Sequence, residues 1–216
     1  MSEVRALLLT DVVDSTQLSE RLGEAELAAL WAAHDRLARD LLPVRRGREI
    51  DKTDGMLLLF EAAADAVAYA MAYQRALAKL NPPLKARAGV HVGPVILREN
   101  SQSDVARGAK PLEVEGMAKA VAARVMSIAN GGQTLLSADA RNALGEITLR
   151  VESQGHWRMK GIAEPIELFE VGEADALFVP PPDAAKGYRV VREGDLWLPA
   201  RNIKHSLPAE LDSFVT

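Results

Sequence analysis

An apolar run near the start of the chain predicts a buried strand. Residues Val4–Leu9 are rich in Leu and Val, which is typical of a strand covered on both faces. A polar turn begins at Asp11, and the hydroxyl of Ser15 or Thr16 is suited to cap the helix that follows. Apolar residues then recur at helical spacing, and Gly23 interrupts them. We therefore expect a helical segment that is broken at this glycine.

The next part of the pattern predicts a hairpin, a helix and a strand. Glu49–Lys52 and Met56–Phe60 are short strand-like runs, joined by a turn in which Asp54 is followed by glycine. Asp-Gly is a strong signal for a tight hairpin. The alanine-rich segment Ala62–Leu80 predicts a helix, and Ala86–Leu97 predicts another strand.

The second half continues with one helix and several short strands. The helix is expected over Gly116–Ala129, and the strands over Gln133–Ser137, Leu149–Ser153 and Ile166–Val171. Because two strands joined by a tight turn are antiparallel, the sheet must be mixed or antiparallel and covered by helices. This order excludes a doubly wound parallel sheet.

Composition narrows the function classes. The 216 residues are 48% hydrophobic and carry a formal net charge of −4, so no general attraction to nucleic acid or an anionic membrane is expected. The chain has no cysteine, which excludes disulfides, thiolate nucleophiles and cysteine-bound zinc. No stretch approaches the roughly 20 apolar residues of a membrane span. We therefore expect a cytoplasmic protein without membrane or nucleic-acid partners.

Two acidic residues stand where strands are expected to end. Asp11 follows the first strand, and Asp54 lies at the tip of the hairpin. Each has an ordinary explanation, since such residues often cap helices or form turns. As a pair on neighbouring strands, however, they would form an oxygen-ligand site for Mg²⁺ or Mn²⁺. Two such ions suit in-line displacement at a phosphate.

Five ordered blocks resemble the class III nucleotidyl cyclase domain, the catalytic domain of most adenylate and guanylate cyclases, here of bacterial type. They are LLLTDVVDST, DGMLLLF, AGVHVGPV, EGMAKAVAARVMSIANGGQTLLS and HWRMKGIAEPIELFEV, spread from about Val4 to Gly172. The resemblance implies a ferredoxin-like βαββαβ core, an α+β fold with a mainly antiparallel sheet and helices packed on it. It also implies a head-to-tail homodimer with composite sites at the interface.

The resemblance assigns the metal and phosphate ligands. Asp11 and Asp54 match the two aspartates that hold two divalent ions, Mg²⁺ or Mn²⁺, and Val12 matches a position whose backbone carbonyl also contacts metal. Ser15 and Thr16 lie in the turn that contacts phosphate.

The resemblance also assigns two cations to the partner subunit. Arg124 matches the arginine that stabilises charge on the α-phosphate, and Lys160 matches the lysine that reaches the terminal phosphates. The implied reaction is attack of the 3′-hydroxyl on the α-phosphorus, which releases pyrophosphate.

The chain departs from the family pattern where the ribose and base are recognised. Ala120 stands at the position of the ribose-orienting asparagine and cannot form a side-chain hydrogen bond. An ungapped alignment puts Ile50 at the first base-reading position, and Lys52 could serve only if the hairpin shifted register. Glu113 aligns with the second base-reading position and can accept from more than one base.

The family match ends at Gly172. We therefore expect a cyclase domain over residues 1–172, and a linker and connector over 173–216 whose removal changes stability little. A short β-like stretch is expected around Tyr188 to Val191, and LPAELDSFV resembles the entry into signalling ATPase modules. A further domain of that kind would then follow the chain.

Three functions fit these residues. The first is a metal-dependent cyclase that acts on a nucleoside triphosphate, with ATP as the default substrate. The second is a nucleotide-binding, dimerising regulatory module without turnover, because Ala120 and the altered hairpin remove two expected groups. The third is a cyclase for a pyrimidine or guanine nucleotide. Retention of all four matched residues, Asp11, Asp54, Arg124 and Lys160, favours an enzyme.

Overall fold

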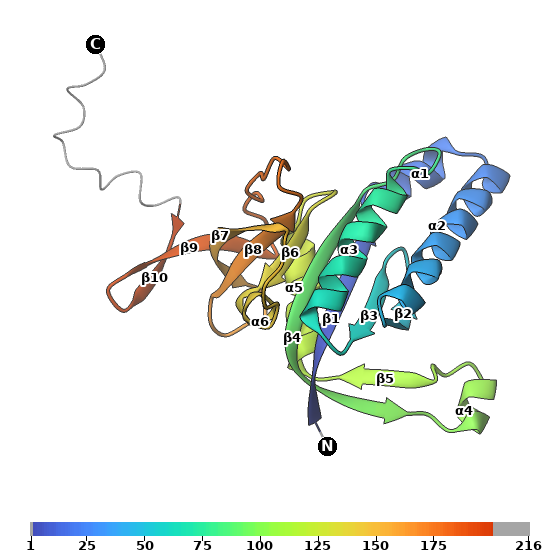
Figure 1. Ribbon diagram of the computed structural model, residues 1–216, viewed down its shortest axis with the longest axis horizontal. Helices are drawn as coiled ribbons and strands as arrows, with labels where there is room; N and C mark the ends of the chain where they lie inside the picture. The colour runs from blue at the N-terminus through green and yellow to red at the C-terminus, as the bar shows by residue number, and fades with distance from the viewer. Residues whose placement is uncertain (1, 201–216) are drawn as a thin grey trace, which may run out of the picture.

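The computed structural model describes residues 2–200 and consists of one twisted sheet with helices on both faces (Figure 1). The strands are β1 (Ser2–Val12), β2 (Arg48–Lys52), β3 (Met56–Phe60), β4 (Ala86–Glu99), β5 (Leu112–Glu115), β6 (Thr134–Ser137), β7 (Arg150–Met159), β8 (Ile166–Gly172), β9 (Gly187–Glu193) and β10 (Leu196–Pro199). The helices are α1 (Ser15–Arg21), α2 (Glu24–Val44), α3 (Ala63–Leu77), α4 (Gln102–Ala106), α5 (Met117–Ile128) and α6 (Ala138–Asn142). None of the helices in this described part is long and apolar enough to cross a membrane.

The first four strands form the expected ferredoxin-like core. Their order in the sheet is β4-β1-β3-β2, and each neighbouring pair is antiparallel. Strand β6 joins the other edge of β4 in parallel, and β8, β7, β9 and β10 extend the sheet in antiparallel pairs. The predicted fold class, α+β with a mainly antiparallel sheet, is confirmed.

Side-chain alternation along β1 sorts its residues between two hydrophobic clusters. Ala6 and Leu8 pack in the cluster that includes residues of α2 and α3, whereas Leu7 packs with residues of β5 and α5. Since successive side chains of a strand point to opposite faces, Thr10 lies on the α2–α3 face and Asp11 on the α5 face. This separation lets one strand serve both the core and the candidate site.

Helix α5 lies directly against β4 because a glycine permits it. A Cβ atom at Gly89 would stand 2.2 Å from the backbone nitrogen of Met126, too close for any other residue without a shift. This close approach sets the distance between β4 and α5, the helix that carries Arg124.

The two expectations about the first helix have different outcomes. The helix break at Gly23 is confirmed, since α1 ends at Arg21 and Gly23 is the N-cap of α2. Capping of α1 by Ser15 or Thr16 is wrong. The N-cap is Asp14, which makes no side-chain capping bond and has a left-handed backbone with φ of 59°. The turn therefore closes through the backbone, with the Leu18 N–H donating to the Asp14 carbonyl at 2.9 Å.

The described part of the tail is joined to the sheet. The β-like stretch expected around Tyr188 to Val191 is confirmed as part of β9, which pairs with β7, and Val190 is buried. The Gln133 amide donates to the Val179 carbonyl at 3.0 Å. The domain boundary after residue 172 stays a prediction, and the motif LPAELDSFV lies outside the described residues.

Candidate active site

The structure brings the hairpin turn that carries Asp54 beside Asp11 of β1. β1 and β3 are antiparallel, with Leu9 opposite Leu57, so the hairpin tip comes beside the end of β1. A Cβ atom at Gly55 would stand 1.7 Å from the Thr10 carbonyl oxygen and 2.9 Å from the Asp11 Cα. Glycine is therefore required after Asp54 for this approach, beyond its use in the turn.

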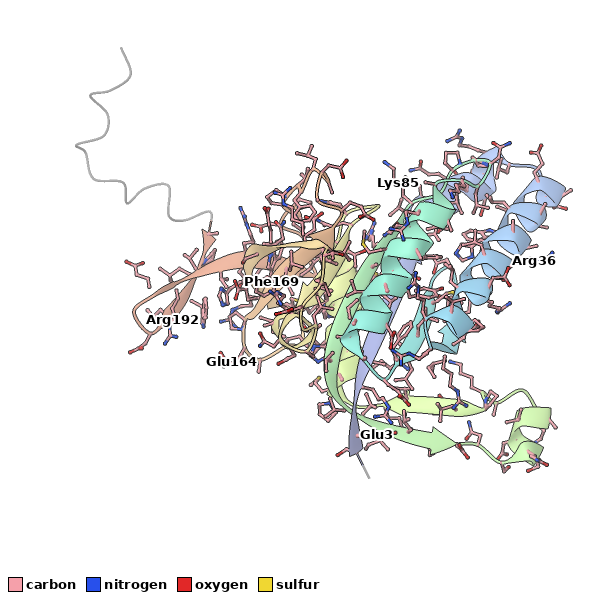
Figure 2. All side chains as sticks on the ribbon, viewed as in Figure 1. Glu3, Arg36, Lys85, Glu164, Phe169 and Arg192 are labelled. Atoms are coloured by element: carbon pink, nitrogen blue, oxygen red, sulfur yellow. The ribbon has the colours of Figure 1, made fainter. Side chains whose placement is uncertain are left out.

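A buried hydrogen bond holds this approach. The Met56 N–H donates to the Thr10 hydroxyl at 3.0 Å, and both residues are almost fully buried. The site lies at the end of the sheet where the Val13 N–H donates to the Lys85 carbonyl at 3.0 Å, and Lys85 is labelled there in Figure 2.

The electrostatics of Asp11 reflect its neighbours. Burial raises the pKa of the Asp11 carboxyl, and the negative charge of Asp54 raises it further. Arg87 and Lys186 oppose this effect, and the Arg87 Nε lies 3.9 Å from Asp11 Oδ2. A bound cation would stabilise the ionised form of Asp11, which burial and a neighbouring negative charge disfavour.

The donor set fits a hard divalent cation. The Ser15 hydroxyl donates to Asp54 Oδ2 at 3.3 Å, so carboxylate and hydroxyl oxygens converge at the hairpin. Oxygen ligands are those that Mg²⁺ and Mn²⁺ prefer, and Mg²⁺ commonly takes only one or two carboxylates plus substrate phosphates. Among residues 2–200 there is no group of three or more acidic or histidine side chains that could hold a metal ion.

Two other matched positions lie around the same turn. Val12 is the last residue of β1, and Thr16 is exposed in the first turn of α1. Their assigned contacts, a metal–carbonyl contact for Val12 and a phosphate contact for Thr16, stay predictions.

Arg124 of α5 and Lys160 in the turn after β7 form a second cluster. The Arg124 Nε donates to the Lys160 carbonyl at 2.7 Å, which joins α5 to the turn after β7. The Lys160 side chain is exposed. The cations that act on Asp11 are Arg87 and Lys186 rather than this pair.

Two cations near Asp11 were missed by the sequence analysis. Arg87 is directly opposite Asp11 in the β1–β4 register, and pairing of the first and fourth strands is a tertiary feature with no local signal. Lys186 precedes β9, and its carbonyl accepts from the Lys160 N–H at 3.0 Å. It lies beyond the family match, so nothing in the motif pattern indicates it.

The expected base-reading residues Lys52 and Glu113 have separate polar partners. Lys52 pairs with Asp35 of α2, with 2.9 Å between Nζ and Oδ2. Glu113 of β5 accepts from the Asn100 amide at 3.5 Å. Ile50 is buried in the cluster on the α5 face. Which residues read the base therefore stays open.

Curated and structural relatives support the resemblance, although no protein-family model matches the chain. A Rhizobium meliloti protein named "Putative adenylate cyclase 3" is 26% identical over an alignment of 189 residues that covers 84% of this chain. The chain spans only 30% of the length of that relative.

Solved structures of nucleotidyl cyclases share the fold. The adenylyl cyclase CyaB from P. aeruginosa has a TM-score of 0.72 and 17% identity, covering 81% of this chain and 97% of that one. An adenylate cyclase from Trypanosoma brucei, in its monomeric state, has a TM-score of 0.72 and 20% identity, covering 82% and 92%. The guanylyl cyclase Cya2 has a TM-score of 0.68 and 25% identity, covering 82% and 97%.

Proposed function

We propose that this chain, whose fold is shared with solved nucleotidyl cyclase domains and whose sequence resembles them, converts a nucleoside triphosphate to a 3′,5′-cyclic nucleotide and pyrophosphate. Both adenylate and guanylate cyclases are among the similar proteins, so ATP is the default substrate and the base is open. The observation that carries the proposal is the approach of the Asp54-Gly55 turn to Asp11 across the β1–β3 pair, because the sheet brings together acidic residues that are far apart in the sequence.

Each described residue has a chemical task in this reaction. Asp11 and Asp54, with the Val12 carbonyl, would hold two Mg²⁺ or Mn²⁺ ions. When bound, these ions supply positive charge that lowers the pKa of the attacking 3′-hydroxyl and neutralises the phosphates. The hydroxyls of Ser15 and Thr16 would bind phosphate oxygens at the start of α1.

The displacement itself is balanced by cations. The 3′-oxygen forms a bond to the α-phosphorus, the bond to the pyrophosphate oxygen breaks, and the hydroxyl proton leaves to solvent. Arg124 offsets the negative charge that grows on the α-phosphate, and Lys160 binds the terminal phosphates. Arg87 and Lys186, which act on Asp11, add positive charge beside the departing pyrophosphate.

We also propose a homodimer with two composite sites. Arg124 and Lys160 are joined to one another, whereas Arg87 and Lys186 are the cations acting on Asp11. A transition-state arginine must face the phosphate from the side opposite the metal ions. In a two-fold dimer, each subunit would provide this arginine to the site of the other subunit, which gives two equivalent sites.

A second function is favoured by Ala120, which is exposed on α5 and offers no hydrogen bond to a ribose. The chain would then bind nucleotide without turnover and serve as a dimerising regulatory module.

Incubation with Mn²⁺ and each of the four ribonucleoside triphosphates, followed by mass spectrometry of the products, separates these functions. A cyclic nucleotide from one triphosphate supports the cyclase and identifies its base. Binding of a triphosphate without any cyclic product, measured by calorimetry on the same preparation, would support the regulatory module instead.

A further inference from the structure

A chain of hydrogen bonds links the two strands of the Asp54 hairpin through the protein core. On one side, Lys52 of β2 pairs with Asp35 Oδ2 at 2.9 Å. On the other side, Met56 of β3 donates its N–H to the Thr10 hydroxyl at 3.0 Å. These two strand residues flank the turn that carries Asp54, so both ends of the turn are tied to the interior.

His34 and Tyr73 complete the series of hydrogen bonds between Lys52 and Met56. The fully buried His34 ring lies between the Tyr73 hydroxyl, 2.7 Å from Nε2, and Asp35 Oδ1, 3.0 Å from Nδ1. The Thr10 hydroxyl lies beside the Tyr73 hydroxyl and opposes the effect of burial, which raises the pKa of Tyr73. The sequence of contacts therefore runs from β3 through β1, α3 and α2 to β2.

The proton positions agree along the whole chain. A neutral His34 donates from Nδ1 to Asp35 and accepts at Nε2 from the Tyr73 hydroxyl, and Asp35 keeps its second oxygen for Lys52. Burial lowers the pKa of His34. Burial alone would raise the pKa of Asp35, but hydrogen bonds from His34 and Lys52 lower it below its usual value. Each polar group thus has a partner in one consistent arrangement.

The direction of Lys52 excludes a second task for it. In the β2–β3 register Lys52 is opposite Met56, which packs in the cluster on the α2–α3 face. Asp11 lies on the other face of the sheet, as the alternation along β1 requires. The Lys52 ammonium is therefore held on the face opposite to the Asp11 carboxylate.

We propose that Lys52 is a positioning residue, which holds the Asp54 hairpin through Asp35 and so keeps the two carboxylates together. It does not read the base. This inference rests on the proposed function, because the carboxylate pair acts only by holding cations. The network itself is independent of activity, and it can be tested in the protein without nucleotide.

The variants are Lys52→Met, Asp35→Asn and their double variant. The matched control is Arg98→Met, because Arg98 also joins two paired strands, β4 and β5, through Glu115, with 3.3 Å between Nη2 and Oε1, outside the network. Lys52→Arg is the conservative variant, which keeps the positive charge.

Three measurements decide the proposal. Amide hydrogen exchange over residues 53–56 should speed up about tenfold or more in Lys52→Met and Asp35→Asn, with little further change in the double variant. Mn²⁺ affinity, measured by electron paramagnetic resonance of the free ion, should fall about tenfold in both. Lys52→Arg should keep values close to those of wild type, and Arg98→Met should resemble wild type.

The relative rates with the four triphosphates provide the opposing outcome. Equal loss with every triphosphate supports positioning, whereas a changed ratio in Lys52→Met but not in Asp35→Asn would show that Lys52 reads the base. Unchanged hydrogen exchange in both variants would also overturn the proposal. If wild type binds no Mn²⁺, the metal site of the proposed function fails, and the exchange result still decides the role of the network.

Discussion

Gly55 lies so close to Thr10 that a Cβ atom on it would stand 1.7 Å from the Thr10 carbonyl oxygen. Replacement by alanine must therefore push the hairpin away from β1, which separates Asp54 from Asp11. We expect Gly55→Ala to lower the free energy of unfolding by about 1–3 kcal/mol, as overpacking does. Mn²⁺ affinity should fall by at least about tenfold, or 1.4 kcal/mol.

Urea unfolding and Mn²⁺ titration measure these two effects separately. Gly23→Ser is the matched control, since Gly23 has no atom near its would-be Cβ and serine is a good N-cap. Wild-type Mn²⁺ affinity in Gly55→Ala would mean that the approach of the hairpin is unnecessary for metal binding.

Much of this site could be predicted from the sequence because its parts have local signals. The acid at the end of a Leu-rich run and the Asp-Gly turn each mark a strand end, and the resemblance pairs them. Arg87 has no such signal, since its place opposite Asp11 depends on the pairing of β1 with β4. The face of the sheet on which the Lys52 side chain lies was likewise not predictable, because it depends on a register shift between Glu49 and Asp51.

The fold was predictable for a similar reason. The hairpin makes β2 and β3 antiparallel, and the resemblance supplies the remaining order. The cap of α1 was not predictable, because Asp14 adopts a left-handed backbone in place of a side-chain cap. The attachment of β9 to β7 was also missed, since a proline-rich segment before a short apolar run resembles a linker in sequence.

The tail is expected to contribute stability, contrary to what its sequence indicates. Truncation after Gly172 removes β9 with its buried Val190, and the carbonyl of Val179 that accepts from Gln133. Burial of a valine side chain contributes about 1.5–3 kcal/mol. We expect the melting temperature to fall by about 4–8 °C, as a loss of roughly 2 kcal/mol does in a domain of this size.

Val190→Ala tests the same contact without a truncation. Calorimetry should show a smaller loss in this variant than in the truncated chain, and Val191→Ala, at a less buried position of β9, should change little. A truncated chain as stable as the full chain would mean that the tail is only a connector.

Lys186 is expected to assist triphosphate binding. It acts on Asp11 electrostatically, and its backbone is tied to Lys160. Loss of one exposed charge-assisted contact corresponds to about threefold to tenfold in affinity. Lys186→Ala should raise the KM for the triphosphate by that factor with little change in kcat, whereas Arg189→Ala, an exposed cation on β9, should change neither. Equal values for Lys186→Ala and wild type would remove Lys186 from the site.

Two buried histidines predict how stability depends on pH. Burial lowers the pKa of His34; the hydrogen bond and charge of Asp35 oppose this shift, whereas the smaller effects of Lys52 and Arg39 add to it. Burial likewise lowers the pKa of His91, which lies near Asp139. Below about pH 6.5, the usual histidine value, the unfolded chain binds protons that the folded chain does not. Stability should therefore fall as the pH drops from 6.5 towards the lowered folded values.

Urea unfolding between pH 4.5 and 7.5 (a range chosen around the usual histidine pKa of about 6.5) measures that slope. His34→Gln should reduce it by the part that one histidine contributes, and His91→Asn should reduce it similarly. A slope unchanged in both variants would mean that neither ring resists protonation in the folded protein.

The composite site predicts complementation between two inactive variants. Asp54→Ala removes a carboxylate and Arg124→Ala removes the arginine assigned to the partner's site, so each homodimer should be inactive. Refolded together in equal amounts, the two chains should form heterodimers in about half of all dimers. Each heterodimer then has one site with both changes and one with neither. Activity should return to roughly a quarter of wild type, by the symmetry of a two-fold pair.

The matched control is a mixture of Asp11→Ala and Asp54→Ala. Both aspartates are assigned to the same side of each site, so every site in such a heterodimer lacks one of them and activity should not return. No recovery in the first mixture, with heterodimers demonstrated and wild type active, would mean that all these residues act within one subunit.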